Sequence, residues 1–325
     1  MGPKVFIDGE AGTTGLQIRQ RLAGRKDLQV VSIDPEKRKD PAARADLLNA
    51  SDAVILCLPD EPAKEAVGLV TSNSVKVIDA SSAHRVAPGW TYGFPEMVDG
   101  QRAALARSTR ISNPGCYPTG FIALMAPLVS GGLVPKSFPV TVNAVSGYTG
   151  GGKGLIEEFS NAPPESIHDA FRDYGLTLQH KHVPEMTKYV GLDHPPVFAP
   201  SVGRYAQGMI VEVPLQLWAL PGSVTSKQLR EALADFYQDE QFVSVASEEE
   251  TAALQKKRAG AGGYVAELDP EALNNTNQLK LFVFANDTTQ QVRLLALFDN
   301  LGKGASGAAV QNLNIALGLE ESAGL

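Results

Sequence analysis

The fold is decided near the start of the chain by the stretch VFIDGEAGTTGLQIRQRL, which occupies residues 5–22. Its first residues, Val5 to Asp8, form an apolar run that is typical of a buried β-strand. Ile18 and Leu22 lie four residues apart and therefore share one face of a helix. The stretch predicts a strand, a glycine-rich turn and a helix that packs on the sheet.

The turn is divided by three glycines, Gly9, Gly12 and Gly15. Glycine lets the backbone approach a pyrophosphate without Cβ clashes, and the helix directs its N-terminus at the phosphate charge. The spacing is G-x-x-G-x-x-G rather than the more common G-x-G-x-x-G, so a glycine-rich turn without a ligand is the competing interpretation. The flanking strand and helix favour dinucleotide binding by the three glycines with Thr13 and Thr14.

Further apolar runs in the first third of the chain alternate with helical patterns. This alternation is typical of an α/β fold, in which helices flank a parallel sheet. The additional strands are expected at residues 28–34, 53–58, 75–80 and 109–112.

The residues leave the choice of dinucleotide open. Asp34 is expected to end the second strand, where a carboxylate accepts from the ribose hydroxyls of NAD and repels a 2′-phosphate. Lys37, Arg38 and Lys39 follow at once and are able to neutralise that phosphate. A solvated basic turn is the alternative interpretation of this run.

Composition narrows the class of protein. The chain has 325 residues, enough for two domains, and no apolar run approaches the roughly 20 residues that span a bilayer. Only two cysteines and no signal-peptide pattern at the start favour a reducing cytoplasm. A net charge of −7 argues against a nucleic-acid-binding surface, although a small anionic substrate remains compatible with it.

From about residue 114 to 299 the pattern changes to longer strand-like segments with fewer helices between them. It favours an antiparallel or mixed sheet with helices on one face. Strands are expected at 138–146, 209–217, 279–285 and 291–298, an amphipathic helix at 225–237, and a surface loop with a helical turn or two at 247–263.

Cys116 lies where a strand-like segment gives way to an apolar helical one. Backbone N–H groups at a helix start lack partners within the helix, and this favours a thiolate over a thiol. The competing interpretation is a buried structural cysteine, which is our prediction for Cys57. The neighbouring motifs favour a nucleophile at Cys116.

A histidine pair, His180 and His182, precedes Glu185. In an extended segment, residues two apart point the same way, so both imidazoles are expected at one site. No zinc-like set of Cys, His or Asp accompanies them, and we expect no metal. The pair suits a general acid or base beside a thiolate, with Glu185 as the orienting carboxylate.

A glycine-dense loop, residues 146–153, contains Gly150 and ends at Lys153. Its amides and this cation suit a phosphate or the cofactor; a flexible turn is the alternative. Arg85 and Arg204 are candidates to bind the phosphate or carboxylate of a substrate, and for each a structural salt bridge is equally compatible.

Four segments together resemble the N-acetyl-gamma-glutamyl-phosphate reductase family of arginine biosynthesis, in its shorter, type 2 group, within the aspartate-semialdehyde-dehydrogenase-like superfamily. The resemblance extends over essentially the whole chain. The segments are FIDGEAGTTG (6–15), SNPGCYPT (112–119), HKHVPEM (180–186) and DNLGKGASGAAVQNLN (299–314).

The resemblance implies a Rossmann domain at 1–115 and 302–325 and an α+β catalytic and dimerisation domain at 116–301, with the last helix returning to the Rossmann domain. It implies NADPH, a homo-oligomer and reduction of N-acetyl-gamma-glutamyl phosphate to the 5-semialdehyde through a Cys116 thioester. Ser81 and Asn312 are assigned to the cofactor, and Asn113 to the substrate. Asn312 lies in the glycine-rich start of the final helix, where its amide is able to contact the nicotinamide carboxamide; helix capping or packing is the alternative.

Three other functions share some of these motifs. A reductase of another acyl phosphate, such as aspartyl or carrier-linked aminoadipyl phosphate, would share the thiolate and the glycine turn. A Cys/His hydrolase or amidotransferase would have no use for the turn, and a non-catalytic dinucleotide sensor would have no use for the thiol.

Overall fold

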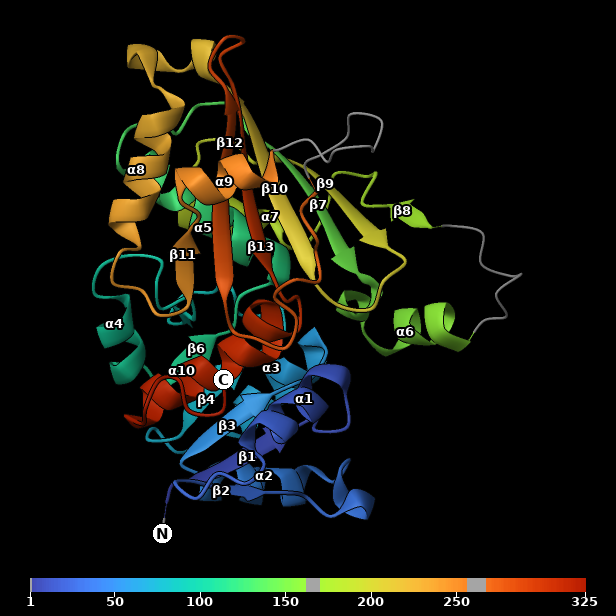
Figure 1. The fold of residues 1–325 in the computed structure, drawn as a ribbon. Coiled ribbons are helices and arrows are strands. Elements are labelled where there is room, and N and C mark those ends of the chain that lie inside the picture. Colours follow the sequence, from blue (N-terminus) through green and yellow to red (C-terminus); the bar gives the residue numbers. More distant parts are fainter. Residues whose placement is uncertain (1, 162–169, 256–266) are drawn as a thin grey trace. The chain divides into compact units, whose positions relative to one another are not determined.

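The computed structural model describes residues 2–161, 170–255 and 267–325 (Figure 1). The chain divides into two compact units. Unit 1 comprises Met1–Cys116, Gly151–Leu155 and Leu301–Leu325, and unit 2 comprises Tyr117–Gly150 and Ile156–Asn300. The sequence predicts domain boundaries after residues 115 and 301. That the chain consists of two domains with these boundaries stays a prediction.

Unit 1 contains a six-stranded parallel sheet in the order β2-β1-β3-β4-β6-β5. Its strands are β1 (Lys4–Asp8), β2 (Gln29–Val31), β3 (Ala53–Leu56), β4 (Lys76–Asp79), β5 (Thr91–Tyr92) and β6 (Arg110–Ser112). Because β1 lies between β2 and β3, the strand order reverses beside it, and open α/β sheets bind ligands beyond the carboxyl ends of the strands at such a point. The glycine turn follows β1 at this edge.

Helices cover both faces of this sheet, since alternate residues of β1, β3 and β4 belong to two different apolar clusters. One cluster joins the strands to α1 (Thr13–Leu22), α4 (Gln101–Arg107) and α10 (Gly307–Leu317). The other joins them to α2 (Pro41–Ala50) and α3 (Asp60–Leu69). Ile18 and Leu22 are buried in the first cluster, as the sequence predicts. The helix α10 thus belongs to the core of unit 1.

The second strand is shorter than expected, and Asp34 does not end it. The strand β2 stops at Val31, and a 3-10 turn, η1 (Pro35–Lys37), follows. Asp34 caps this turn because its carboxylate accepts a hydrogen bond from the backbone N–H of Glu36 at 3.0 Å. Pro35, with its fixed φ and no N–H, suits the start of a helical turn better than a strand.

Unit 2 contains a seven-stranded mixed sheet in the order β11-β12-β13-β10-β7-β9-β8. The strands are β7 (Thr141–Gly147), β8 (Phe171–Asp173), β9 (Val197–Gly203), β10 (Met209–Gln216), β11 (Val243–Val245), β12 (Leu279–Asn286) and β13 (Gln291–Phe298). The pairs β7–β9 and β11–β12 are parallel and the others antiparallel. The predicted mixed sheet is confirmed.

Helix α5 (Cys116–Ser130) is buried along almost its whole length. Gly120 allows it to lie close to the sheet, because a Cβ there would stand 2.8 Å from the Phe298 ring and 2.9 Å from Val211 Cβ. Pro127 inside the helix has no N–H for the carbonyl of Ala123, four residues earlier. The hydroxyl of Tyr237 donates to that carbonyl at 3.0 Å and replaces the missing bond.

The remaining α-helices of unit 2 are shorter. They are α6 (Gly152–Asn161, whose first residues belong to unit 1), α7 (Val183–Val190), α8 (Ser226–Phe236) and α9 (Glu248–Leu254), with short 3-10 turns at Tyr148–Gly151, Leu217–Ala219 and Pro221–Ser223. The expected helix at 225–237 is α8, capped by Thr225. The expected loop at 247–263 begins with α9, and its residues from 256 lie outside the described ones. Within the described residues, every helix is too short or too polar to cross a bilayer.

Candidate active site

The glycine turn of unit 1 forms a cradle of backbone atoms. A Cβ on Gly9, which has a φ of +90°, would lie 2.3 Å from the carbonyl oxygen of Cys57, and a Cβ on Gly15 would lie 2.5 Å from that of Gly9. Gly12 is the N-cap of α1 and offers no side chain to the first N–H groups of the helix. Close backbone packing and an uncapped helix start fit a pyrophosphate.

Beside this cradle lies a cavity of about 460 Å³ at the carboxyl ends of β1, β2 and β3. Arg38 and Lys39 line it, whereas Lys37 of the same basic run does not. The complete lining is Ile7, Asp8, Gly9, Glu10, Ala11, Ile33, Arg38, Lys39, Arg44, Leu58, Pro59, Pro62 and Glu65. Asp34 is not among these residues, so the acid that suggested NAD does not reach the cavity.

The loop after β4 is organised around the buried carboxylate of Asp79. The N–H and hydroxyl of Ser81 donate to its two oxygens at 2.9 and 2.7 Å. His84 Nδ1 lies 2.6 Å from the same carboxylate, and the His84 ring stacks on Trp90 with centroids 4.1 Å apart. The Ser81 hydroxyl therefore donates within the protein, and its assignment to the cofactor stays a prediction.

Asn113 fixes the chain just before the candidate nucleophile. Its backbone N–H donates to the carbonyl of Asp79 at 2.7 Å, and its side-chain amide donates to Ala305 at 3.0 Å. Arg85, which is 8% exposed, donates from Nε to the Asn113 carbonyl at 3.0 Å. Three residues after Asn113, α5 begins at Cys116. The predicted nucleophile thus occupies the first position of a helix whose approach is held by hydrogen bonds.

Cys57 is only partly buried, against the apolar cluster that also holds Ile18, and not fully buried as predicted. Burial, with smaller contributions from Asp79 and Asp8, raises the pKa of its thiol to about 12. This thiol stays protonated at neutral pH, which agrees with a structural role.

Asn312 lies in the middle of α10 and not at a helix start, so it is not a capping residue. Its side-chain NH₂ donates to the carbonyl of Gly93 at 2.9 Å and to Oδ1 of Asn113 at 3.1 Å. Within the described part of the chain, its own Oδ1 is buried without a hydrogen-bond partner. A buried acceptor of this kind fits the carboxamide NH₂ of a nicotinamide.

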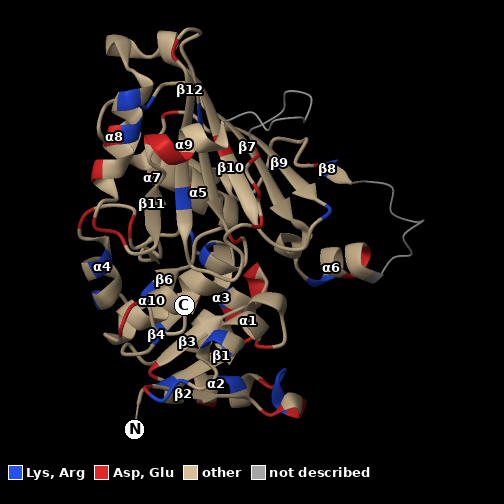
Figure 2. Cartoon of the chain, viewed as in Figure 1, with Lys and Arg blue, Asp and Glu red and all other residues tan. Residues whose placement is uncertain are grey.

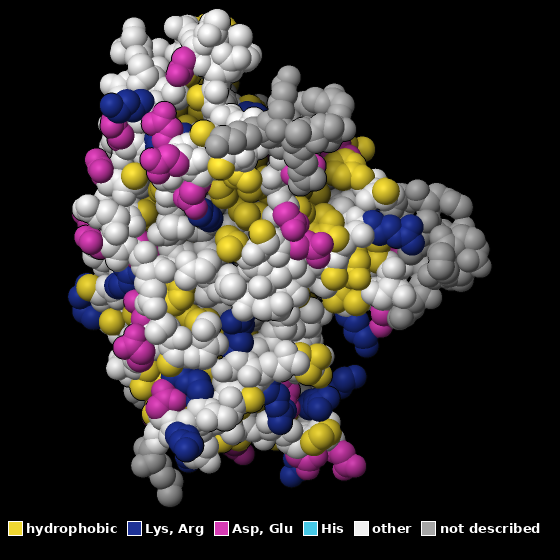
Figure 3. Space-filling model, viewed as in Figure 1, with side chains coloured by type: hydrophobic (Ala, Val, Ile, Leu, Met, Phe, Trp, Pro, Cys, Tyr) yellow, Lys and Arg dark blue, Asp and Glu magenta, His cyan; other side chains and the backbone are white. Residues whose placement is uncertain are grey.

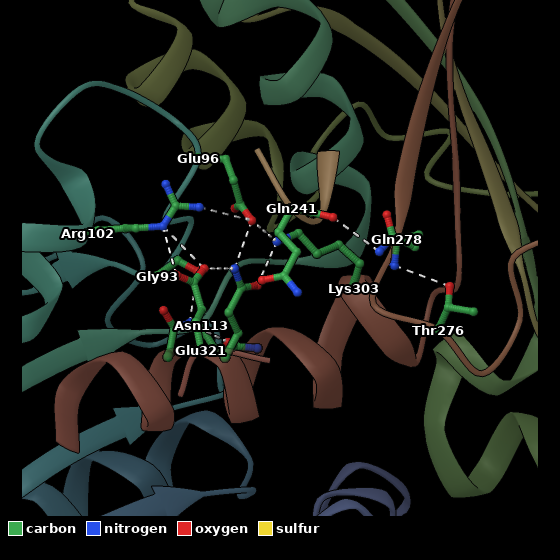
Figure 4. A network of polar contacts seen from close by, with 11 residues as sticks. Gly93, Glu96, Arg102, Asn113, Gln241, Thr276, Gln278, Lys303 and Glu321 are labelled. Atoms are coloured by element: carbon green, nitrogen blue, oxygen red, sulfur yellow. Dashed lines mark hydrogen bonds and ion pairs between the residues drawn. The ribbon is translucent and has the colours of Figure 1, made fainter. Parts of the chain in front are cut away.

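A buried ion pair ties the C-terminal segment into unit 1 (Figure 4). Lys303 lies in a π-helical turn, η6 (Gly302–Ser306), and its Nζ is 2.7 Å from Oε1 of Glu96. The two side chains are 1% and 0% exposed. Gln311 bridges them, since its amide oxygen accepts from Lys303 and its NH₂ donates to Glu96, at 2.7 and 2.8 Å. Burial raises the pKa of Glu96, but Lys303 and Gln311 together outweigh burial and lower it below its usual 4.5.

The histidine pair lies in unit 2, at the start of α7. The segment is a turn rather than the expected extended strand, since His182 has helical φ and ψ angles and the N–H of Val183 donates to the His180 carbonyl. The turn still brings the two rings together, with centroids 4.7 Å apart. The backbone N–H of His182 donates to Nδ1 of His180 at 3.2 Å. A neutral His180 therefore carries its proton on Nε2.

Aromatic side chains pack around the two histidines. Tyr117, the residue after Cys116, has its ring centroid 6.2 Å from that of His180 and 5.8 Å from that of His182. The hydroxyl of Tyr117 donates to the carbonyl of Ser201 at 3.1 Å, which fixes its ring. The contact of Tyr117 with the histidines was not predicted, because an aromatic residue in an apolar helix is usually a packing residue.

The other predicted residues are placed less distinctively. Glu185 is buried, at 1% exposure, in the first turn of α7. Gly150 lies in a 3-10 turn where Thr149 accepts a hydrogen bond from Asn300 at 3.0 Å. Lys153 and Arg204 are exposed. The roles assigned to these four residues stay predictions.

The predicted residues thus divide between the two units. Unit 1 holds the glycine turn, Arg38, Ser81, Arg85, Asn113, Cys116, Lys153 and Asn312, and unit 2 holds Gly150, His180, His182, Glu185 and Arg204. Residues that sequence reasoning missed are Arg44, Glu96, Lys303 and Tyr117. Among the residues described, no group of three or more His, Cys, Asp or Glu side chains is arranged to hold a metal ion.

Family models match both parts of the chain. The semialdehyde dehydrogenase NAD-binding domain matches residues 4–105, and the semialdehyde dehydrogenase dimerisation domain matches residues 116–300. The fold is similar to that of aspartate semialdehyde dehydrogenase II from Vibrio cholerae complexed with ASA, with a TM-score of 0.69, 13% identity and coverage of 97% and 98% of the two chains. The fold is also similar to that of aspartate semialdehyde dehydrogenase with NADP from Candida albicans. The TM-score is 0.63 at 12% identity, and 97% of this chain and 98% of that chain are covered. The chain is a member of the semialdehyde dehydrogenase class.

Curated relatives define the family more narrowly. The N-acetyl-gamma-glutamyl-phosphate reductase of Trichormus variabilis is 52% identical, with 99% of each chain covered. That of Mesorhizobium japonicum is 53% identical, with 98% of this chain and 100% of the relative covered. The chain belongs to the N-acetyl-gamma-glutamyl-phosphate reductase family.

The buried ion pair gives a testable stability prediction. Glu96→Gln should lower the free energy of unfolding by about 3–5 kcal/mol at pH 7, because it leaves the Lys303 charge buried without its counter-charge. The folded-state pKa of Glu96 is lowered, so its stabilisation is present above pH 4.5 and is lost as the pH falls through the folded pKa. Urea unfolding at several pH values should show the two proteins converging in acid.

Glu61→Gln is the matched control, since Glu61 pairs with Lys64 on the surface and is 78% exposed. This variant should unfold like the wild type at every pH. A Glu96→Gln protein as stable as the wild type at pH 7 would contradict a stabilising pair.

Proposed function

We propose that this chain catalyses the NADPH-dependent reduction of N-acetyl-gamma-glutamyl phosphate to N-acetylglutamate 5-semialdehyde and phosphate, a step of arginine biosynthesis. The observation that carries the proposal is Cys116 at the first position of α5, in a chain about half identical to reductases of that name over nearly its full length. The glycine cradle in unit 1 supports a dinucleotide cofactor.

The reaction begins at the thiolate of Cys116. Its sulfur attacks the acyl carbon, the bond to the phosphate oxygen breaks, and a thioester forms while the leaving phosphate takes up a proton. NADPH, when bound, supplies a hydride to the thioester carbon. The resulting oxyanion on the Cys116 adduct requires hydrogen-bond donors, which backbone N–H groups at a helix start provide. Collapse of this adduct releases the aldehyde and restores the thiolate.

The residues of unit 1 fit the cofactor. Gly9, Gly12 and Gly15 would approach its pyrophosphate through their backbone, with Thr13 and Thr14 at the start of α1. Arg38 and Lys39 would meet the 2′-phosphate at the cavity that they line. The buried Oδ1 of Asn312 would accept from the nicotinamide carboxamide.

Of the pair, His180 is the better candidate to give the leaving phosphate its proton. Its Nδ1 accepts from the backbone N–H of His182, so the neutral ring presents Nε2–H as a hydrogen-bond donor. Proton transfer from Nε2 requires the imidazolium, in which Nδ1 is protonated and gives up that bond. His182 is 6% exposed and supports the turn that holds His180. Arg85, beside Asn113, is the candidate for binding the substrate phosphate.

The oligomer forms, in this proposal, on the face of the mixed sheet that carries the side chains of Ile210, Phe284 and Leu295. Hydrophobic side chains gather there, as Figure 3 shows for the visible face. A groove of about 690 Å³ on this face is lined by apolar side chains such as Ile210, Pro214 and Phe284. The match of residues 116–300 to a dimerisation domain supports a second copy of the chain as the occupant. A homo-oligomer in the cytoplasm is the expected state.

The reverse reaction tests the substrate. With NADP⁺ and phosphate, the chain should oxidise N-acetylglutamate semialdehyde with a kcat/KM about 10²-fold or more above that for aspartate semialdehyde, because buried polar groups discriminate strongly between such substrates. NADPH formation is followed by absorbance. Sustained turnover without phosphate, or a preference for aspartate semialdehyde, would contradict the proposal.

Variants of the histidine pair test the proton donor. His180→Asn should lower kcat by about 10²- to 10⁴-fold with little change in KM and should remove one ionisation from the pH profile of kcat/KM. His182→Asn is the matched control, from which we expect a smaller effect on kcat and the same ionisation. Near wild-type rates and unchanged profiles in both variants would rule out a catalytic role for the pair.

A further inference from the structure

A third basic residue lines the cavity that Arg38 and Lys39 border, and it lies outside the basic run of the sequence. Arg44 belongs to the first turns of α2, six residues after Arg38. Figure 2 marks basic and acidic residues in the turn that precedes this helix. A role of Arg44 at the adenosine end of the cofactor rests on the NADPH dependence of the proposed function.

The guanidinium of Arg44 is oriented by Asp8, the last residue of β1. Nη2 and Nε donate to the same carboxylate oxygen, Oδ2, at 2.7 and 3.2 Å. The Arg44 and Asp8 side chains are only 12% and 8% exposed. In the described part of the chain, Nη1 of Arg44 makes no hydrogen bond. The rigid fork of the guanidinium is therefore fixed by one partner and has donors left for another.

Acidic residues at this cavity would repel a phosphate unless they were neutralised. Asp8 is paired with Arg44, and Glu10 is paired with Arg19 at 2.6 Å. Glu10 also accepts from the hydroxyl of Ser32 at 3.0 Å. The remaining lining carboxylate, Glu65, is exposed. The two ion pairs thus keep the inner wall of the cavity from being anionic.

We propose that Arg44, held by Asp8, is a specificity-determining residue that recognises a 2′-phosphate on the adenosine half of the cofactor. Arg38 and Lys39 add exposed positive charge beside it, and Arg44 adds donors of fixed direction. A planar fork suits phosphate oxygens better than a flexible ammonium does. Asp8 acts as a positioning residue, since its carboxylate sets the direction of the guanidinium.

Calorimetric titration of the full-length chain with 2′,5′-ADP and with 5′-AMP tests this assignment. Removing Arg44 alone would leave Asp8 buried without its counter-charge, so the test variant is the double substitution Asp8→Asn with Arg44→Gln. It should bind 2′,5′-ADP at least about tenfold more weakly than the wild type, while 5′-AMP binding changes less than about twofold.

Two single variants complete the set. Arg44→Lys keeps the charge next to Asp8 and loses the fork, so it should give an intermediate loss for 2′,5′-ADP and remains informative if the double variant fails to fold. Lys37→Ser is the matched control, because Lys37 belongs to the same basic run but does not line the cavity. It should bind both ligands like the wild type.

Equal losses for both ligands would mean that the Asp8–Arg44 pair only holds the fold of the cavity, and unchanged 2′,5′-ADP binding would mean that Arg44 does not meet the phosphate. Either result overturns the inference while the reductase assignment stands. A wild-type chain that binds 2′,5′-ADP no better than 5′-AMP would instead contradict the NADPH dependence itself.

Discussion

The position of Asn113 is the constraint on which the candidate site of unit 1 depends. Its backbone N–H donates to the carbonyl of Asp79, the last residue of β4. Its side chain donates to the carbonyl of Ala305 and accepts from the side chain of Asn312, both in the C-terminal segment. That segment is in turn held by the buried pair of Lys303 and Glu96. These bonds hold the chain just before α5 begins at Cys116. The C-terminal residues therefore support the segment that carries the candidate nucleophile.

Much of the fold was predictable because the chain is locally consistent. Several segments have a residue pattern that favours a single local structure. They are the glycine turn between Asp8 and Thr13, the apolar strands of the first sheet and the amphipathic helix α8. Strand β9 was missed because its sequence, VFAPSVG, contains a proline and lacks alternation. The end of β2 was predicted too late because capping by Asp34 competes with extension of the strand, and a propensity alone does not decide that competition.

The candidate site residues were predictable where one short segment contains the reactive side chains, as around Cys116 and His180. They were not predictable where two residues far apart in the sequence form an ion pair. Glu96 and Lys303 are 207 residues apart, and Asp8 and Arg44 are 36 apart. Each of these residues is an ordinary charged side chain in the sequence, and only the fold makes it buried and paired. Removing one partner of a buried pair leaves the other charge in the protein interior without a counter-charge, which is strongly destabilising. The fold therefore restricts the substitutions that are tolerated at these positions.

The central claim, covalent catalysis by Cys116, is tested most directly by trapping the acyl-enzyme. The chain is mixed with N-acetylglutamate 5-semialdehyde and NADP⁺ in phosphate-free buffer, quenched in acid and digested for mass spectrometry. Without phosphate the thioester has no acceptor other than water, so the peptide containing Cys116 should carry an N-acetylglutamyl group. The Cys57 peptide should be unmodified, and a Cys116→Ala variant should give no adduct and no NADPH. Formation of NADPH with Cys116 unmodified, or with the acyl group on another residue, would contradict the account.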